Sequence, residues 1–364
     1  MTRRSFLQSA VKTILAMGFG GLFSPRSAFA ADGIQHLRQM VTAHPAKTRM
    51  IQWDSPQQLE NVRVELRDST GHIDRTIPAY TYLAMDDEVQ FIYRCEIPAT
   101  AGSFYRVTHA AGATDWIPLL PIHEKDHVCA LLFSDSQCGE SYDVWGATYQ
   151  TAWERHPNAD CAAIVGDLTD NGESAWHWRS FFESMETGTA LARHPHVPVL
   201  GNHEYYGLQW TAIPPVRYLK TFALPDNGSR DFRGHYYSFD LGSVHCIVLD
   251  TQFLEAEERG DTLKAEQMDW LRRDAATSAA PWKIVLMHKD ILAYGDYQPE
   301  QNRNDGISDV GQVFLDVFDE LGIDLVVSGH VHAYRRRIRA RQTDEHGTLY
   351  LLAGPAGNQY FDVR

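Results

Sequence analysis

Five short blocks along the chain contain the residue types that hold divalent or trivalent metal ions. Each contributes an aspartate, an asparagine or a histidine, whose oxygen and imidazole donors suit first-row metals. The blocks are Ser134-Asp135-Ser136-Gln137, Gly166-Asp167-Leu168-Thr169-Asp170, Gly201-Asn202-His203-Glu204, His288 and Gly329-His330-Val331-His332. Together they predict one site that binds two metal ions.

The elements that must position these blocks are short buried strands. Four blocks follow a β-branched or aliphatic run, so each ligand stands where a strand ends and a loop begins, as in the sites of open α/β sheets. After about Pro121 such runs alternate with helical stretches, which is an α/β pattern. We expect strands over 128–133, 161–165, 197–200, 244–249, 284–287 and 325–327, and helices over 149–155, 176–186, 265–276 and 310–321.

The first part of the chain has a different pattern. Short runs with period-two alternation, such as 48–53, 61–66 and 89–95, are separated by turn-forming residues. Roughly seven strands in about 90 residues suit a small antiparallel sandwich. The sequence therefore predicts an N-terminal β-sandwich domain over 31–123 and an α/β catalytic domain over 124–364.

Each block alone is a weak signal, and the prediction of a metal site rests on the order and spacing of the whole set. Gly166-Asp167 alone is usually a turn, and a histidine such as His288 usually satisfies its hydrogen bonds at a strand end. In the full set, Asp167 stands behind a glycine, where its two oxygens could bridge two cations. Asn202 offers an amide oxygen and leaves the neighbouring His203 free for proton transfer.

The ordered series Asp-x-x, Gly-Asp-x-x-Asp, Gly-Asn-His-Glu, a strand-end histidine and Gly-His-x-His resembles the calcineurin-like metallophosphoesterase superfamily. The leading β-sandwich, with Tyr236-Tyr237-Ser238-Phe239 ahead of 244–250, is similar to the purple acid phosphatase branch. This resemblance implies a four-layer α/β (α+β) sandwich of two mixed β-sheets flanked by helices. A small all-β domain of the fibronectin III type would precede it.

The resemblance also implies a role for each residue. Asp135 and His332 would hold one metal, Asn202, His288 and His330 would hold the other, and Asp167 would bridge the two. His203 would act beside the phosphate as general acid or electrostatic clamp. The implied reaction is hydrolysis of a phosphomonoester by in-line attack of a metal-activated water or hydroxide. The alternatives are a phosphodiesterase acting on nucleotides or lipid head groups, and an inactive cell-surface binding protein.

Two positions depart from the family pattern. Gln137 stands where many members have histidine, so either its amide oxygen binds a metal or its side chain contacts substrate. Asp170 stands where purple acid phosphatases have the tyrosine that gives the ferric charge-transfer colour, so we do not expect an iron–tyrosinate centre. Asp170 either orients a ligand or is a plain turn carboxylate. Iron, manganese and zinc are all admissible.

The N-terminus resembles a twin-arginine signal over residues 1–30. Arg3-Arg4 precedes an apolar stretch over about 11–23 and the small residues of Ser27-Ala28-Phe29-Ala30-Ala31. We expect cleavage after Ala30, passage through the twin-arginine export machinery and a periplasmic or secreted protein. An N-terminal amphipathic or anchoring helix is the alternative, and we expect no transmembrane helix in the mature chain.

Composition excludes one class of partner and leaves other residues as structural. The net charge of −14 argues against a nucleic-acid-binding surface. The partner that the family resemblance implies is a small phosphate-ester substrate. The five cysteines fit no zinc motif and are expected to be small buried residues, with one disulfide possible after export. We expect His235 and His245 to be structural, Arg335-Arg336-Arg337 to be solvated, and Tyr205, Tyr206 or Tyr294 either to line the substrate side or to pack.

Overall fold

The computed structural model describes residues 33–85, 90–100, 103–122, 127–292, 306–340 and 347–360. The predicted signal over 1–30, the predicted division between residues 123 and 124, and Tyr294 lie outside the described residues. Within the described part of the chain, no helix combines the length and the apolar character that crossing a membrane requires.

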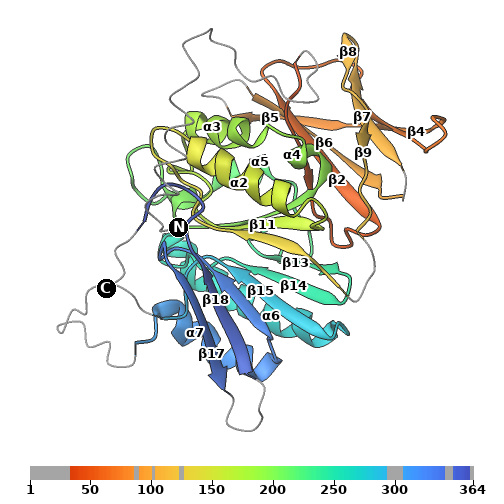
Figure 1. Ribbon diagram of the computed structural model, residues 1–364. Helices are drawn as coiled ribbons and strands as arrows, with labels where there is room; N and C mark the ends of the chain where they lie inside the picture. Colours follow the sequence, from red (N-terminus) through yellow and green to blue (C-terminus); the bar gives the residue numbers. More distant parts are fainter. Residues whose placement is uncertain are drawn as a thin grey trace, which may run out of the picture.

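Two mixed β-sheets pack face to face at the centre of the molecule (Figure 1). The seven-stranded sheet has the order β10 (Ala130–Phe133), β11 (Cys161–Val165), β12 (Pro195–Val199), β1 (Gln35–Met40), β2 (Thr48–Ser55), β6 (Gln90–Pro98) and β5 (Tyr80–Met85). The six-stranded sheet has the order β13 (Tyr237–Leu241), β14 (Val244–Leu249), β15 (Trp282–Met287), β16 (Leu325–Ser328), β18 (Gly347–Ala353) and β17 (Tyr334–Ala340). Strands β10 to β12 are parallel, and so are β14, β15, β16 and β18.

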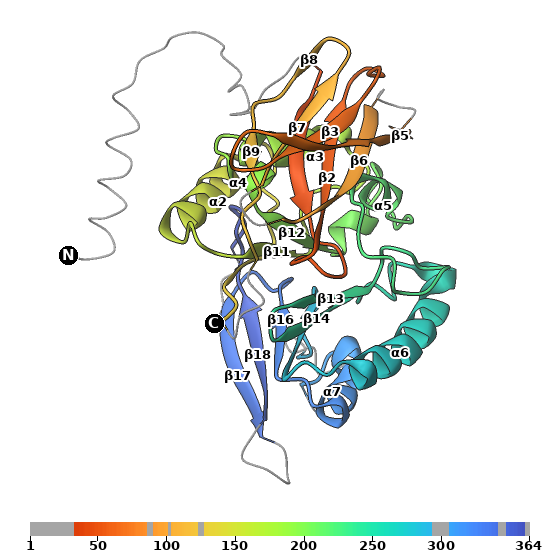
Figure 2. The ribbon, with the colours of Figure 1, turned by 90° about the vertical axis from the view of Figure 1, so that its right-hand side faces the viewer.

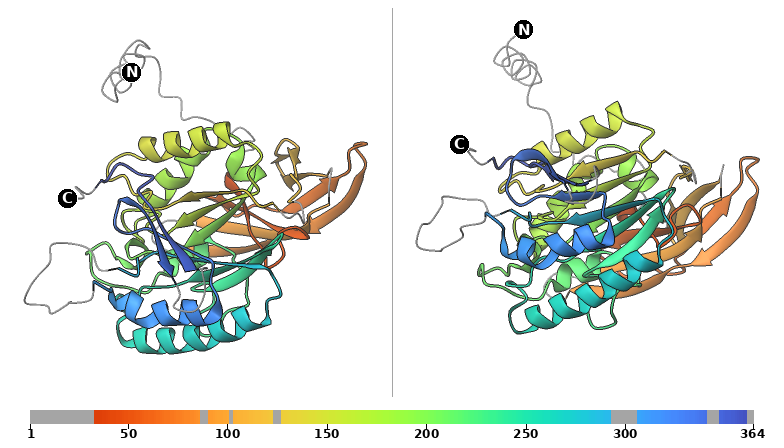
Figure 3. Two further views of the ribbon diagram at one scale, coloured as in Figure 1. Left: turned by 60° about the horizontal axis from the view of Figure 1, so that its bottom comes forward. Right: turned by 90° about the horizontal axis from the view of Figure 1, so that it is seen from below.

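Helices cover the outer faces of the two sheets. The helices beside the seven-stranded sheet are α2 (Asp143–Arg155), α3 (Ala175–Met185), α4 (Ala190–Arg193) and α5 (Val216–Thr221). On the six-stranded sheet lie α6 (Gly260–Thr277) and α7 (Asp309–Leu321), side by side in Figure 3. Two short 3-10 turns, η1 (His203–Tyr205) and η2 (Glu257–Arg259), interrupt the loops. This order of helix, sheet, sheet and helix confirms the predicted four-layer fold.

Alternation along each buried strand explains the layers. In β11, Cys161, Ala163 and Val165 pack between the two sheets, whereas Ala162 and Ile164 pack toward α2 and α3. Successive side chains of a strand point to opposite faces, so a strand buried on both sides must be apolar throughout. That requirement is why the sequence shows these strands as unbroken apolar runs.

The N-terminal strands are joined to the rest of the fold more closely than a separate domain would be. A third sheet holds β4 (Ile73–Pro78), β3 (Arg63–Arg67), β7 (Phe104–His109) and β8 (Gly112–Ala113), with β9 (Ile117–Pro118) paired to β7 (Figure 2). The strands β1, β2, β5 and β6, however, extend the seven-stranded sheet, because β1 pairs in parallel with β12. A buried ion pair reinforces this junction, in which Arg38 Nη2 lies 2.9 Å from both Asp54 Oδ1 and the Thr221 carbonyl oxygen.

The predicted elements after residue 128 all occur. The strands over 161–165 and 244–249 match β11 and β14 residue for residue, whereas the helix expected over 149–155 already begins at Asp143. The sequence analysis did not include the hairpin of β17 and β18, which follows the last histidine block. The fibronectin III type of the N-terminal strands stays a prediction.

Candidate metal centre

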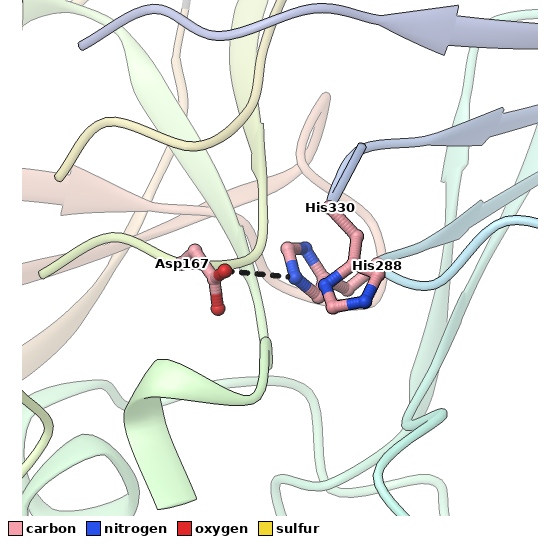
Figure 4. Close-up of side chains that lie close together, drawn as sticks. All are labelled: Asp167, His288 and His330. Carbon is pink, nitrogen blue, oxygen red and sulfur yellow. Dashed lines mark ion pairs between the residues drawn. The ribbon is translucent and has the colours of Figure 1, made fainter. Parts of the chain in front are cut away.

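Each predicted ligand follows the carboxyl end of a parallel strand. On the seven-stranded sheet Asp135 follows β10, Asp167 follows β11 and Asn202 follows β12; on the six-stranded sheet His288 follows β15, and His330 and His332 follow β16. These strand ends meet at one edge of the sandwich, because all the strands concerned point the same way within their sheets. Figure 4 shows Asp167 facing His288 and His330.

The side chains form two clusters that share one carboxylate. Among the described residues, the donor atoms of Asp167, His288 and His330 lie within 4.8 Å of one another, and so do those of Asp135, Asp167 and His332. Asp167 Oδ2 is 3.1 Å from His288 Nε2, and Asp135 Oδ1 is 3.5 Å from His332 Nε2. A carboxylate common to two donor clusters is an arrangement that suits two neighbouring cations.

Asn202 adds a neutral oxygen to the first cluster. Its Oδ1 lies 3.2 Å from His288 Nε2, and its Nδ2 donates to the Tyr206 hydroxyl at 3.3 Å. The amide is thereby oriented with its oxygen toward the imidazole donors. The structure thus brings all six predicted metal ligands together at one place.

The backbone is strained at four of these six residues. Asp135, Asp167, His330 and His332 have φ angles of 52°, 51°, 72° and 48°, in the left-handed region that side chains rarely adopt. Each such conformation costs of order 1–3 kcal/mol and persists only where the surrounding structure imposes it. Gly329 shows how tight the site is, since a Cβ there would lie 2.7 Å from Asp135 Oδ2.

Electrostatics at the centre favour positive charge. Burial alone would raise the pKa of Asp167, but the His288 and His203 charges outweigh it and hold that pKa well below its usual range. Burial would likewise lower the pKa of His288, yet the charge and hydrogen bond of Asp167 raise it to about 9. Burial and the charge of His288 lower the pKa of His330 to about 3. The carboxylates therefore stabilise a cation among the imidazoles.

The donor set fits a pair of metal ions. Two carboxylates, one amide oxygen and three imidazoles are hard and borderline donors of the kind that iron, manganese and zinc accept. Gln137 adds a further observation, because its Oε1 is buried and has no hydrogen-bond partner. The same amide places Nε2 3.1 Å from His332 Nε2, so Gln137 belongs to the cluster of Asp135 and His332.

His203 lies beside this centre, and one of its ring nitrogens is engaged in a hydrogen bond. Its Nδ1 donates to the Asp170 carbonyl oxygen at 2.6 Å, and its backbone N–H donates to Asp167 Oδ1 at 2.9 Å. Its Nε2 then points to Asp167 Oδ2 at 3.8 Å. Burial lowers the pKa of His203, but the Asp167 charge and the Asp170 carbonyl outweigh it and raise the pKa. The ring can therefore hold a proton at Nε2.

Asp170 lies outside both clusters and supports one of them. Its carboxylate accepts hydrogen bonds from the backbone N–H groups of Cys138 and Gly139, from the Tyr142 hydroxyl at 2.8 Å and from Gln359 Nε2 at 3.1 Å. The Gln359 carbonyl in turn accepts from His332 Nδ1 at 2.9 Å. Of the two roles predicted for Asp170, this geometry favours the orientation of a ligand.

Glu204 and Gln359 are supporting residues that the sequence analysis did not assign. The buried Glu204 carboxylate accepts hydrogen bonds from the N–H groups of Asp167, Leu168 and Gly201 at 3.0, 2.9 and 2.8 Å, so it joins the loops after β11 and β12. Burial and the Asp167 charge raise the pKa of Glu204 to about 7. Its place in the Gly201-Asn202-His203-Glu204 block is the signal that could have found it, whereas Gln359 has no such signal.

Several other predictions can be compared directly with the structure. His235 pairs with Asp250 at 2.8 Å, and His245 binds two aspartates, so both histidines have the structural role expected of them. The prediction of a solvated arginine run is wrong for Arg337, whose Nη2 lies 2.8 Å from both oxygens of Asp290. All five cysteines are free, and four of them are buried while Cys129 is exposed.

Comparisons with known proteins agree with this geometry. A family model described as calcineurin-like phosphoesterase matches residues 130–334. An uncharacterized protein of Mycobacterium tuberculosis is 31% identical over 187 residues, which cover 48% of this chain and 34% of that protein. Purple acid phosphatase 15 of Arabidopsis thaliana is 29% identical over 205 residues, which cover 55% and 35%. This chain therefore spans about a third of the length of these two relatives.

A solved structure extends the similarity of fold to the N-terminal strands. The purple acid phosphatase of yellow lupin seeds superposes with a TM-score of 0.69 at 17% identity. The match covers 91% of this chain and 67% of that one. It therefore includes both central sheets and N-terminal strands that precede β10 in the chain.

Proposed function

Since this chain belongs to the calcineurin-like phosphoesterase family, we propose that it is an exported enzyme that hydrolyses phosphomonoesters with two metal ions. The observation that carries the proposal is the position of Asp167, whose carboxylate is common to two donor clusters drawn from both central sheets. A single structural metal would need only one of these clusters. Two clusters at one edge suit a site that acts on both sides of a phosphorus atom.

We assign each ligand to one of two metal positions. Asp135 and His332 would hold the first metal, Asn202, His288 and His330 would hold the second, and Asp167 would contact both. When bound, the cations lower the pKa of a coordinated water and offset the charge on the phosphate oxygens. Gln137 would contribute its Oε1 to the first position, which is supported by the burial of this atom without a hydrogen-bond partner.

His203 is the residue of this chain that would move a proton. Its Nδ1–H is fixed on the Asp170 carbonyl, so the ring cannot turn without losing that hydrogen bond. A proton held at Nε2 faces the same side as the Asp167 carboxylate, where the ester would lie. Donation of this proton to the departing alcohol oxygen completes the hydrolysis.

Hydrolysis of p-nitrophenyl phosphate and of its bis ester, with metal analysis of the same preparation, tests the proposal. We expect about two metals per chain and faster turnover of the monoester. Faster turnover of the bis ester would instead identify a phosphodiesterase. A protein that lacks metal and hydrolyses neither ester would contradict an enzymatic function and support the cell-surface binding protein.

Export is proposed from the pattern of residues 1–30 alone. Sequencing the N-terminus of protein recovered from outside the cytoplasm tests it, and we expect the mature chain to begin at Ala31. Recovery of the exported protein with Met1 intact would contradict a cleaved signal, and a variant in which Arg3 and Arg4 are both lysine should stay inside the cell.

A further inference from the structure

Two aromatic side chains stand beside His203 at the edge of the candidate metal centre. The His203 ring lies 5.4 Å from the Tyr206 ring and 6.3 Å from the Trp210 ring, and the latter two are 6.2 Å apart, all measured between centroids. The Trp210 ring stands nearly perpendicular to the imidazole, at 86°. His203 therefore contacts both Trp210, through its ring, and the Asp167 carboxylate, with Nε2 3.8 Å from Oδ2.

Trp210 is exposed and takes a left-handed backbone conformation at the end of the turn that begins at Gly207. Its side chain is 60% exposed, and its φ angle is 58°. A bulky residue in the left-handed region is a genuine outlier and costs of order 1 kcal/mol or more. An exposed indole also leaves a large apolar surface in water. Glycine or asparagine would fill this left-handed turn position at lower cost, so the choice of tryptophan beside His203 points to a use for its ring.

Backbone hydrogen bonds connect the loop that carries Trp210 to the loops of the centre. A bridge between Tyr206 and Ala212 closes the loop, and the backbone N–H of Trp210 donates to the Gly207 carbonyl at 2.8 Å. Asn171 Nδ2 donates to that same carbonyl at 2.7 Å, and Glu173 Oε2 accepts the Leu208 N–H at 2.7 Å. Asn171 and Glu173 lie just after the Asp167 block, so these hydrogen bonds connect the backbone of the Trp210 loop to the loop that carries a metal ligand.

We propose that Trp210 is a specificity-determining residue that stacks on a planar aromatic ring in the alcohol part of the substrate. This inference rests on the proposed phosphoesterase function. An alcohol whose leaving oxygen takes its proton from His203 must lie against that imidazole, and Tyr206 and Trp210 are the aromatic rings beside it. Indole is the strongest aromatic platform among side chains, and it binds a flat π-face without reading its polar edge. Either an aryl ester or a nucleoside monophosphate carries such a ring.

Comparison of three phosphomonoesters on the metal-loaded, full-length protein tests the proposal. The substrates are 2-naphthyl phosphate, adenosine 5′-monophosphate and ribose 5-phosphate, which is the nucleotide without its base. For each substrate, the ratio of variant to wild-type kcat/KM removes the intrinsic reactivity of the leaving group. For Trp210→Ala we expect this ratio to be about tenfold lower on a ring-bearing ester than on ribose 5-phosphate, since stacking is worth about 1–3 kcal/mol per ring.

Three further variants separate binding from folding. Trp210→Phe keeps a ring and should retain most of the preference. Trp210→Gly should lose the preference while its Tm stays at or above that of the wild type, because glycine adopts a φ of 58° without strain. Trp282→Ala removes another exposed indole, which stands at the start of β15, whereas His288 follows the end of that strand. This variant should leave the preference unchanged.

Each outcome has a definite meaning. A loss of kcat/KM confined to 2-naphthyl phosphate would identify an aryl ester as the substrate. A loss confined to adenosine 5′-monophosphate would identify a nucleotide. An equal change on all three substrates in both Trp210→Ala and Trp210→Gly would overturn the role of Trp210, with the phosphoesterase function intact. A wild-type protein that hydrolyses none of the three would instead defeat the proposed function, and the inference with it.

Discussion

The two central sheets bring different chemistry to the same place. The seven-stranded sheet supplies oxygen donors through Asp135, Asp167 and Asn202, and the six-stranded sheet supplies only imidazoles, through His288, His330 and His332. Each of the two clusters takes members from both sheets. Carboxylates on one side and imidazoles on the other attract each other even before a cation binds, as the pKa values of Asp167 and His288 show. The site and the packing of the sheets therefore depend on each other.

The two sides also hold their ligands by different means. On the oxygen-donor side, the Glu204 carboxylate and the loop hydrogen bonds orient the backbone around Asp167. On the imidazole side, backbone carbonyls orient two of the rings. Val165 of β11, in the opposite sheet, accepts from His288 Nδ1 at 2.9 Å, and Gln359 accepts from His332 Nδ1 at 2.9 Å. These two rings thereby present Nε2 to the centre, as metal-binding histidines do.

The largest expected effect comes from removing the shared carboxylate. Asp167→Ala should lose both metals and reduce turnover of p-nitrophenyl phosphate by roughly a thousandfold or more, which exceeds the ten- to hundredfold cost of losing a supporting group. Asp170→Ala is the matched control, because it is a buried carboxylate of the same block outside both clusters. It should keep the metal of His288 and His330 and lose about ten- to hundredfold. Equal loss of metal in both variants would contradict the prediction that the Asp167 carboxylate is shared by two metals.

Removing one imidazole at a time should divide the site. His330→Ala belongs to one cluster and His332→Ala to the other, so each should retain about one metal per chain while activity falls by roughly a hundredfold or more. Metal content measured by atomic emission checks the prediction, with Asp167→Ala as the reference for complete loss. If either single variant lost both metals, the two clusters would form one cooperative unit and not two separate positions.

Chelation should weaken the junction between the sheets. A ligand that binds only the folded protein stabilises it by about 4 kcal/mol at a thousand times its dissociation constant, so removal of metal by EDTA should lower Tm by several degrees. Thermal unfolding with and without EDTA measures the difference. Asp167→Ala should show almost no response to EDTA, and a response equal to that of the wild type would place the stabilising metal elsewhere.

Local patterns along the sequence were sufficient to predict the α/β alternation and to find the metal-centre candidates, whereas the four layers were implied by the family resemblance. The strand over 161–165 is apolar on both faces, and Asp167 follows it directly, so element and ligand are both readable within a few residues. The pairing of β1 with β12 was not readable, because it joins segments far apart in the chain and leaves no periodicity of its own. The same holds for the ion pair of Arg337 with Asp290, which depends on how β17 packs.

Supporting residues were the hardest to predict. Glu204 stands in a recognisable block, but the direction of its side chain depends on the 3-10 turn at His203 and on the loop after β11. Gln359 lies in an irregular segment, and only the folded structure shows its side chain on Asp170 and its carbonyl on His332. Residue type restricts the chemistry of a side chain, whereas tertiary packing decides which neighbour it serves.

The smallest expected effect is on the pH dependence of stability, which should differ between the two sheets. In the seven-stranded sheet, burial lowers the pKa of His196 to about 4. This folded value lies below the unfolded value of about 6.5, so the neutral ring favours folding above pH 6.5 and the benefit is lost as pH falls. The loss between pH 7 and pH 5 is about 2 kcal/mol.

His245 in the six-stranded sheet should respond in the opposite sense. Burial lowers its pKa, but the hydrogen bonds at 2.8 Å to Asp274 and Asp240 outweigh burial and raise it. A raised folded pKa stabilises the protein below the unfolded value, and the benefit is lost as pH rises through the folded pKa. Thermal unfolding of His196→Gln and His245→Gln at pH 5 and pH 7 measures both effects. His196→Gln should cost more Tm at pH 7 than at pH 5, and His245→Gln more at pH 5 than at pH 7; the same pH trend in both would refute the contrast.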